Sequence, residues 1–188
     1  RPELFLPGGN WPTYYNKAKG VNIWGIDNEK FVDFTMVGVG TSVLGYSDQD
    51  INQAAIKAVK LGSMTTLNVP EEIELAEMLI KIHPWADCVR YARTGGESMS
   101  IAIRIARACT KKDKILFCGY HGWHDWYLSA NLKSKKILNK HLLSDLEPMG
   151  VPKGLKDTLI SFKFNNWNDI EKIVKKKAKS CAAIVLEQ

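Results

Sequence analysis

The sequence lacks several features that would place it in a specialised class of protein. It contains no apolar run of the length, about 18 residues, that a transmembrane helix requires. Its first residues, 1–5, do not have the long apolar stretch of a signal peptide. Its four cysteines stand far apart, so no two of them form a zinc-type pair. We therefore expect free thiols in a reducing compartment, no membrane partner and a cytoplasmic protein.

The sequence also lacks the fingerprints of nucleotide and nucleic-acid binding. Neither a P-loop nor a G-x-G-x-x-G stretch follows any expected strand. No known nucleic-acid motif accompanies the lysine-rich segments at 133–136 and 172–179, so solvated helix faces explain them better than a nucleic-acid partner does. The 26 Lys and Arg against 20 Asp and Glu give a formal charge of +6, which also suits an anionic cofactor or substrate.

What is present is an ordinary globular composition with a clear order of elements. We expect a β-hairpin at 21–34 around Asp27-Asn28, helices at 48–61, 70–82, 97–109 and 169–179, and strands at 88–92, 115–118 and 181–186, the last of them buried. Asp48 can cap the first helix and Gly62 can end it, while Pro70 suits the first turn of the second. Strands and helices in alternation predict an α/β fold with a parallel sheet covered on both faces.

A glycine pair between an expected strand and an expected helix is the first candidate site. The segment Thr94-Gly95-Gly96, interpreted as a turn, lets the backbone approach a ligand closely. The helix that follows supplies free N–H groups and a partial positive charge, and the threonine hydroxyl can add a further contact. These features favour a phosphate site, although a plain tight turn would give the same local sequence.

An aromatic loop, residues 119–127, directly follows an expected strand and is the second candidate site. In open α/β sheets, ligands bind at the carboxyl ends of the strands. There Tyr120 can stack on a flat heterocycle, and His121 or His124 can transfer a proton. The alternative is an aromatic loop that only packs on its neighbours. A metal site is not expected, because no second cluster of ligands supports these histidines.

Glu187 follows the last strand, and it is a third candidate at the same edge.

These three pieces, in this order, resemble the class III, ornithine-aminotransferase-like family of pyridoxal-phosphate enzymes, and most closely its glutamate-1-semialdehyde aminomutase-like branch. The resemblance covers the N-terminal half of such a protein. It rests on these segments in register: Leu6–Gly9, Gly25–Asp33, Val43–Tyr46, Arg93–Ser98, Arg104–Arg107, Lys114–Gly122 and Ala183–Glu187. No single segment is specific, but together they identify the family.

The resemblance implies a fold type I pyridoxal-phosphate transferase that forms a homodimer and carries pyridoxal 5'-phosphate. Residues 1–48 would belong to the small domain and residues 49–188 to the large cofactor-binding domain. The implied site residues are Thr94, Gly95 and Gly96 at the cofactor phosphate, Tyr120 and His121 at its ring, and Glu187 in the catalytic network. The implied activity is amino-group transfer, of the aminotransferase or 2,1-aminomutase type, on a small amino acid, amino aldehyde or amino sugar-like substrate.

Two departures from the family pattern bear on function. Gly96 stands where the family usually has threonine, so a hydroxyl contact to the phosphate is lost. Tyr14 stands where aminomutases place the arginine that takes the substrate carboxylate, and a neutral phenol cannot give that bidentate charge pair. Together with Trp11, Trp123 and Trp126, Tyr14 indicates a bulkier and more aromatic substrate pocket.

The residues that complete this chemistry have no candidate in the chain, which ends at Gln188. Neither the lysine that forms the Schiff base nor the aspartate that pairs with the pyridine nitrogen can be assigned. We therefore expect a truncated enzyme that is inactive by itself, whereas its full-length parent is active. The alternative function is a non-catalytic binding or scaffold fragment, and a nucleotide-binding α/β protein is a weaker alternative.

Overall fold

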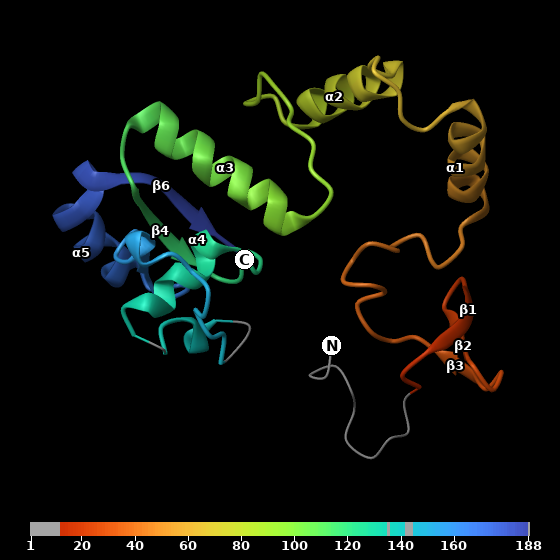
Figure 1. Ribbon diagram of the computed structural model, residues 1–188, viewed down its shortest axis with the longest axis horizontal. Coiled ribbons are helices and arrows are strands. Elements are labelled where there is room, and N and C mark those ends of the chain that lie inside the picture. The colour runs from red at the N-terminus through yellow and green to blue at the C-terminus, as the bar shows by residue number, and fades with distance from the viewer. Residues whose placement is uncertain (1–11, 135, 142–144, 188) are drawn as a thin grey trace. The chain divides into compact units, whose positions relative to one another are not determined.

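The computed structural model describes residues 12–134, 136–141 and 145–187 and forms two compact units, residues 1–73 and 74–188 (Figure 1). The first unit holds β1 (Tyr15–Lys19), β2 (Asn22–Gly25), β3 (Lys30–Val32) and α1 (Gln49–Leu61), and α2 (Pro70–Ile82) starts at its end. The second holds α3 (Gly95–Thr110), β4 (Lys114–Cys118), α4 (Asp125–Leu128), β5 (Leu159–Ser161), α5 (Trp167–Lys177) and β6 (Cys181–Leu186), with short 3-10 turns between them. The assignment of residues 1–48 and 49–188 to different domains of the whole protein stays a prediction.

The predicted hairpin is confirmed and supplies two strands of an antiparallel sheet with the order β1-β2-β3. β2 pairs with β3 from Asn22 opposite Val32 to Trp24 opposite Lys30. Asn28 lies in the turn with a φ of 65°, a left-handed conformation that asparagine tolerates better than most residues do. β1 is not apparent in the sequence, because its residues, YNKAK, do not alternate between apolar and polar.

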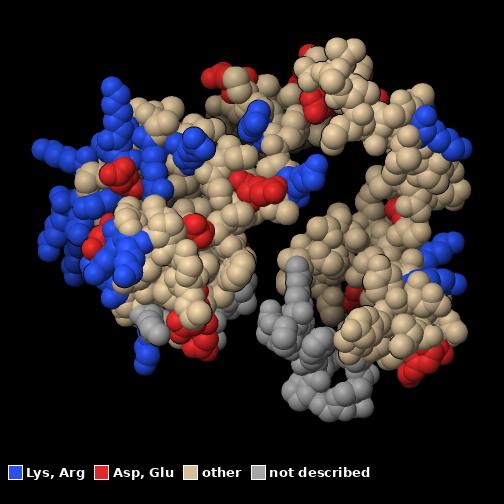
Figure 2. Space-filling view, viewed as in Figure 1, with Lys and Arg blue, Asp and Glu red and all other residues tan. Residues whose placement is uncertain are grey.

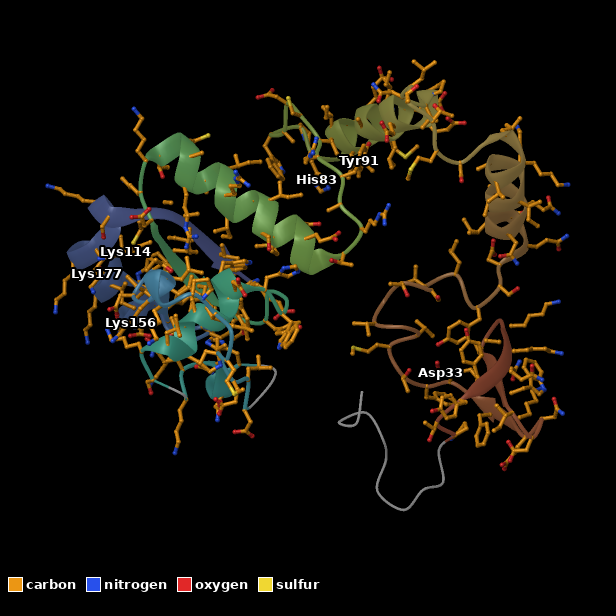
Figure 3. All side chains as sticks on the ribbon, viewed as in Figure 1. Asp33, His83, Tyr91, Lys114, Lys156 and Lys177 are labelled. Atoms are coloured by element: carbon orange, nitrogen blue, oxygen red, sulfur yellow. The ribbon has the colours of Figure 1, made fainter. Side chains whose placement is uncertain are left out.

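A buried carboxylate ties the end of β3 to the loop before α1. Asp33, which is labelled in Figure 3, is 8% exposed. It accepts hydrogen bonds from the Tyr46 hydroxyl at 2.5 Å and from the Thr35 N–H at 2.7 Å. The hydrogen bond from Tyr46 lowers the pKa of Asp33 below its ordinary value of 3.8, because it stabilises the ionised form. The same bond, reinforced by burial, raises the pKa of Tyr46 to about 12.

The helices α1 and α2 lie where the sequence predicts them. The Asp48 side chain accepts hydrogen bonds from the N–H groups of Asp50 and Ile51, and Gly62 ends α1 with a φ of 93°. Pro70 occupies the first turn of α2, as expected. No residue of either helix is buried in the described part of the chain, and large apolar side chains such as Val59, Ile73 and Met78 are exposed there.

The predicted parallel sheet is confirmed in the second unit, where the strand order is β5-β4-β6 and both pairs are parallel. α3 and α4 pack on one face of this sheet and α5 on the other (Figure 1). The alternation of side chains along β4 accounts for both layers. Ile115 and Phe117 pack with Ile103 of α3, whereas Leu116 and Cys118 lie in the cluster that contacts α5.

The lysine-rich segment at 172–179 forms a solvated helix face, as predicted. Ile173 and Val174 of α5 pack against the sheet, while Lys175–Lys177 are exposed. Lys175 forms an exposed ion pair with Glu171 at 2.8 Å. Figure 2 shows Lys and Arg side chains gathered over the part of the second unit around α5. This arrangement is the ordinary amphipathic pattern of a helix that covers a sheet.

Two predictions about strands need correction. Residues 88–92 form no strand, because no described strand lies next to this segment to form hydrogen bonds with it. β6 is only partly buried, since Ile184 and Leu186 are each 53% exposed. β5 is too short to stand out in the sequence.

Among the described helices, none is both long and apolar enough to cross a membrane.

The Asp33–Tyr46 hydrogen bond predicts a pH-dependent contribution to the stability of the first unit. Removing the hydroxyl with Tyr46→Phe leaves a buried carboxylate short of a donor, so we expect a loss of about 1–3 kcal/mol at pH 7. The lowered pKa of Asp33 makes this contribution present above pH 3.8 and lost as the pH falls below that value. The raised pKa of Tyr46 makes it present below pH 10.0 and lost as the pH rises through about 12.

Hydrogen exchange at the amides of Gly20 and Tyr46, which bond to each other's carbonyls at 2.8 Å, measures this effect locally. The matched control is Tyr15→Phe, because Tyr15 is 68% exposed in the same sheet. Equal protection in the wild type and Tyr46→Phe at pH 7 would contradict the prediction.

Candidate functional site

The start of α3 is organised by a reciprocal pair of side-chain caps. The Thr94 hydroxyl accepts a hydrogen bond from the Glu97 N–H at 3.2 Å. The Glu97 carboxylate in turn accepts from the N–H groups of Thr94 at 3.1 Å and Arg93 at 2.9 Å. This capping box places the first helical residue at Gly95. The interpretation of Thr94-Gly95-Gly96 as a turn is therefore wrong in its detail, since both glycines lie in the helix.

The caps leave two amides free at this helix start. In the part of the chain that the structure describes, no hydrogen bond uses the N–H of Gly95 or of Gly96. A Cβ placed on Gly95 would meet nothing within 4 Å, so the space beside it is open. Two unpaired N–H groups at the positive end of a helix dipole form a fitting site for an anionic group.

Gly96 brings the aromatic loop into direct contact with this helix start. A Cβ on Gly122 would lie 2.7 Å from the Cα of Gly96, and a Cβ on Gly96 would lie 2.6 Å from both Cδ2 and Nε2 of His124. Gly122 also has a φ of 98°, a conformation that glycine adopts without strain. Because neither glycine has a side chain, the loop and the helix approach each other more closely than other residues would allow.

Glu187 joins the end of β6 to the start of the same loop. Its Oε2 accepts a hydrogen bond from the Tyr120 N–H at 2.7 Å, and its own N–H donates to the Cys118 carbonyl at 3.1 Å. A Cβ on Gly119 would lie 2.5 Å from the Cβ of Glu187, so this contact too requires glycine. Burial, and then the charge of Glu187, raises the pKa of the Cys118 thiol, which keeps that sulfur protonated.

Tyr120 and His121 point to different surroundings. The Tyr120 ring lies edge-on to that of Tyr127, with ring centroids 5.6 Å apart, and the Tyr127 hydroxyl donates to the Gly119 carbonyl at 3.0 Å. Burial raises the pKa of Tyr127, so its hydroxyl stays neutral. His121 is 7% exposed, and its Nε2 lies 2.8 Å from the Cys118 carbonyl, to which it donates. His121 therefore helps to hold the loop, and its place beside a cofactor ring stays a prediction.

The structure brings most of the predicted cofactor-site residues to one edge of the sheet. Tyr120 follows the carboxyl end of β4, Glu187 follows that of β6, and Gly96 contacts the loop between them. Open α/β sheets bind their ligands at this edge. The described residues contain no cluster of His, Cys, Asp and Glu that could hold a metal ion.

The residues predicted to contact the substrate are not gathered at this edge of the sheet in the described part of the chain. Tyr14 belongs to the first unit, where it is 69% exposed and lines a small cavity with Pro12 and Tyr46. Trp11 lies outside the described residues. Trp126 is 6% exposed and packs in the core, but it also lines a cavity together with the exposed Trp123, so the aromatic-pocket hypothesis stays a prediction.

Three residues of this edge could not be assigned a role from the sequence. His141 accepts a hydrogen bond from the Gly119 N–H at 3.1 Å through its Nδ1, across 22 positions in the chain. Gly119 and Gly122 allow the close contacts described above, which depend on tertiary packing. The only signal in the sequence is their place on either side of Tyr120-His121, in a loop that follows a strand.

Comparison with known proteins identifies the class. The sequence matches the aminotransferase class-III family over residues 7–188, so the chain belongs to that family. It is 36% identical over 179 residues to a glutamate-1-semialdehyde 2,1-aminomutase of Nitrosopumilus maritimus, covering 94% of this chain and 41% of that protein. It is 27% identical over 187 residues to a 3-aminobutyryl-CoA aminotransferase of Cloacimonas acidaminovorans, covering 99% and 41%. The chain thus spans about 41% of the length of these relatives.

Solved structures agree on the fold. An omega-transaminase from Sphaerobacter thermophilus matches with a TM-score of 0.79 at 27% identity, over 98% of this chain and 45% of that one. A transaminase with PLP bound matches with a TM-score of 0.80 at 24% identity, over 99% and 45%. The family and the fold class predicted from the sequence are therefore confirmed.

The contact between Gly122 and Gly96 predicts an unequal effect of two glycine substitutions. Gly122 and Gly150 both have a positive φ, at 98° and 86°, so alanine at either position costs about 1–2 kcal/mol in backbone strain. A Cβ on Gly150 meets nothing within 4 Å, whereas one on Gly122 collides with Gly96. We expect Gly122→Ala to cost about 1–3 kcal/mol more than Gly150→Ala in urea-induced unfolding. Equal losses would show that the loop does not pack against the helix as described.

Proposed function

We propose that the full-length protein transfers amino groups with pyridoxal 5'-phosphate, as an aminotransferase or a 2,1-aminomutase. Its substrate class would be small amino acids, amino aldehydes or amino sugar-like amines. The observation that carries this proposal is the pair of free amides at Gly95 and Gly96, at a helix start that contacts the loop containing Tyr120, in a chain of the aminotransferase class-III family. The proposal concerns the whole protein, because the chain covers about 41% of its relatives.

The start of α3 fits the phosphate of this cofactor. The N–H groups of Gly95 and Gly96 can donate to its oxygens, and the positive end of the helix dipole favours its charge. Thr94 accepts from Glu97 through its hydroxyl oxygen, so the hydroxyl hydrogen is still able to donate. We propose these three residues as the phosphate site.

Tyr120 and Glu187 fit the ring end of the cofactor. Contact with Tyr127 sets the orientation of the Tyr120 ring, and the hydrogen bond from the Tyr120 amide to Glu187 sets the start of its loop. When bound, pyridoxal 5'-phosphate supplies an electron sink for the substrate carbon. In this proposal Tyr120 holds the ring by stacking, and Glu187 fixes the loop and places a negative charge beside it.

Substrate contacts are proposed for Trp11 and Tyr14, from their position in the family pattern. Tyr14 lines a cavity of the first unit, which supports a role in binding. A phenol recognises a substrate through one hydrogen bond and an apolar ring face, whereas an arginine gives a bidentate charge pair. This difference favours substrates with an apolar or hydroxylated group at that end.

We also propose that the full-length protein is a cytoplasmic homodimer with a small domain containing residues 1–48. The exposed apolar side chains of α1, including Val59 at 68% and Leu61 at 75%, support an extensive buried interface in the whole assembly. The four cysteines are all free thiols, which agrees with a reducing compartment.

Light scattering of the full-length protein is expected to give the mass of a dimer, and a monomer at micromolar concentration would contradict the proposal.

The proposed function predicts that the ring of Tyr120, and not its hydroxyl, binds the cofactor. Stacking contributes about 0.5–1.5 kcal/mol, so Tyr120→Leu should weaken pyridoxal 5'-phosphate binding by up to about ten-fold. Tyr120→Phe is the matched control, because it keeps the ring and should bind almost as well as the wild type. Equilibrium dialysis of the full-length protein measures both.

The activity itself is tested by incubating the cofactor-loaded protein with a panel of small amines and a 2-oxo acid, and by measuring new amino acid by chromatography. Formation of amino acid supports the proposal. A full-length protein that binds no pyridoxal 5'-phosphate would contradict it.

A further inference from the structure

The imidazole of His124 occupies the space beside Gly96. Its Nε2 lies 2.6 Å from the position that a Cβ of residue 96 would take. A side-chain nitrogen of the residue just before α4 therefore lies next to the point where a side chain of residue 96 would begin. The family resemblance puts a threonine at this position, so the nitrogen lies 2.6 Å from the carbon that would carry the threonine hydroxyl.

His124 is available to bind a ligand there. It precedes the first residue of α4, but its side chain makes no capping hydrogen bond to that helix. Its ring is partly exposed. The amides of Gly95 and Gly96 are the adjacent donors and have no partner within the described residues. An imidazole N–H would add a third donor to these two amides.

The cavity next to this point contains further unmatched donors. His124 lines it together with Arg104, Arg107 and Trp126. Trp126 is 6% exposed, and within the described ranges neither its Nε1–H nor the Nη2 of Arg107 has an acceptor. Asp125 also lines the cavity and is its acidic member. The lining of this cavity continues from His124 along α3 to Arg104 and Arg107, and its two arginines outweigh its carboxylate, so the cavity favours an anion over a cation.

We propose that His124 donates a hydrogen bond to the cofactor phosphate and so replaces the hydroxyl that is absent at position 96. This inference rests on the proposed function. It assigns His124 to binding, and it leaves the proton transfers of the reaction to other groups.

The test compares two non-covalent probes on the cofactor-free, full-length protein. Pyridoxine 5'-phosphate and pyridoxine lack the aldehyde, so neither can react with a lysine, and they differ only in the phosphate. Titration calorimetry gives a Kd for each. We expect His124→Ala to weaken pyridoxine 5'-phosphate by about ten-fold or more, the usual effect of one hydrogen bond to a charged group, and to leave pyridoxine unchanged.

Two variants control for folding and for the loss of a histidine. His124→Asn keeps a side-chain donor and is a good residue for the start of α4, so it should recover part of the phosphate affinity. His83→Ala removes an exposed histidine next to Trp85, and it should bind both probes as the wild type does.

A double substitution tests directly whether the His124 ring takes the place of a threonine hydroxyl at position 96. Gly96→Thr alone should lose phosphate affinity, because its Cβ collides with the His124 ring. Adding His124→Ala removes that ring, so the double variant should bind pyridoxine 5'-phosphate more tightly than Gly96→Thr does. If the double variant loses as much binding free energy as the two single variants lose together, the exchange is contradicted.

The outcomes separate this inference from the proposed function. A wild type that binds both probes equally overturns the phosphate site itself, and the inference with it. A wild type that prefers the phosphorylated probe, while His124→Ala keeps the same preference, overturns the inference alone. Tighter binding of the phosphorylated probe by His124→Ala also overturns it, because the ring would then obstruct the site.

Discussion

The central strand, β4, is the constraint on which the second unit depends. Both of its edges are hydrogen-bonded, to β5 and β6, and its two faces are buried under α3 and α5. Ile115, Leu116 and Phe117 are each at most 1% exposed, so the strand has no freedom to shift its register without exposing apolar surface. Its carboxyl end is therefore fixed in space, and the loop that follows starts from a rigid point.

That loop converts the fixed strand end into a site through three close contacts of glycine. Gly119 admits the side chain of Glu187, Gly122 lies against Gly96, and Gly96 leaves room for His124. Each contact joins segments that are distant in the chain: the end of β6, the loop and the start of α3. A methyl group at any of them would push apart elements that packing holds in place. The geometry of the site thus follows from missing side chains as much as from those present.

Much of this could be predicted from the sequence, and the reasons are local. The caps Asp48 and Thr94 stand directly before their helices, and the β2–β3 hairpin has a turn at Asn28. The burial of β4 on both faces follows from a continuous run of apolar residues bounded by Lys114 and Gly119. The predicted strand at 88–92 failed because a strand requires a hydrogen-bonded neighbour, which no local pattern can supply.

The site was predictable to a lesser degree, because its contacts are long-range. The sequence predicts Gly95 and Gly96 just before a helix, whereas both lie in its first turn, and it correctly places Tyr120 after a strand. It gives no indication that His121 turns inward to the Cys118 carbonyl while His124 lies against Gly96. Two histidines three residues apart in one loop have the same local chemistry, and only packing against the core and against α3 distinguishes them.

The charges at this edge of the sheet differ in sign between its two ends. The start of α3 presents free N–H groups and the positive end of a dipole, whereas the end of β6 presents the carboxylate of Glu187. The short loop from Gly119 to Gly122 connects the end of β6 with the start of α3, because it contacts Glu187 at its beginning and Gly96 at its end. A ligand with a phosphate at one end is attracted at α3 and repelled at Glu187, so one of its two orientations is favoured. Glu187 also contributes to the raised pKa values of Cys118 and Tyr127, although burial is the larger cause for both, and this keeps the neighbouring thiol and phenol neutral. In the proposed function, Glu187 would therefore face the ring end of the cofactor without a competing anion from either side chain.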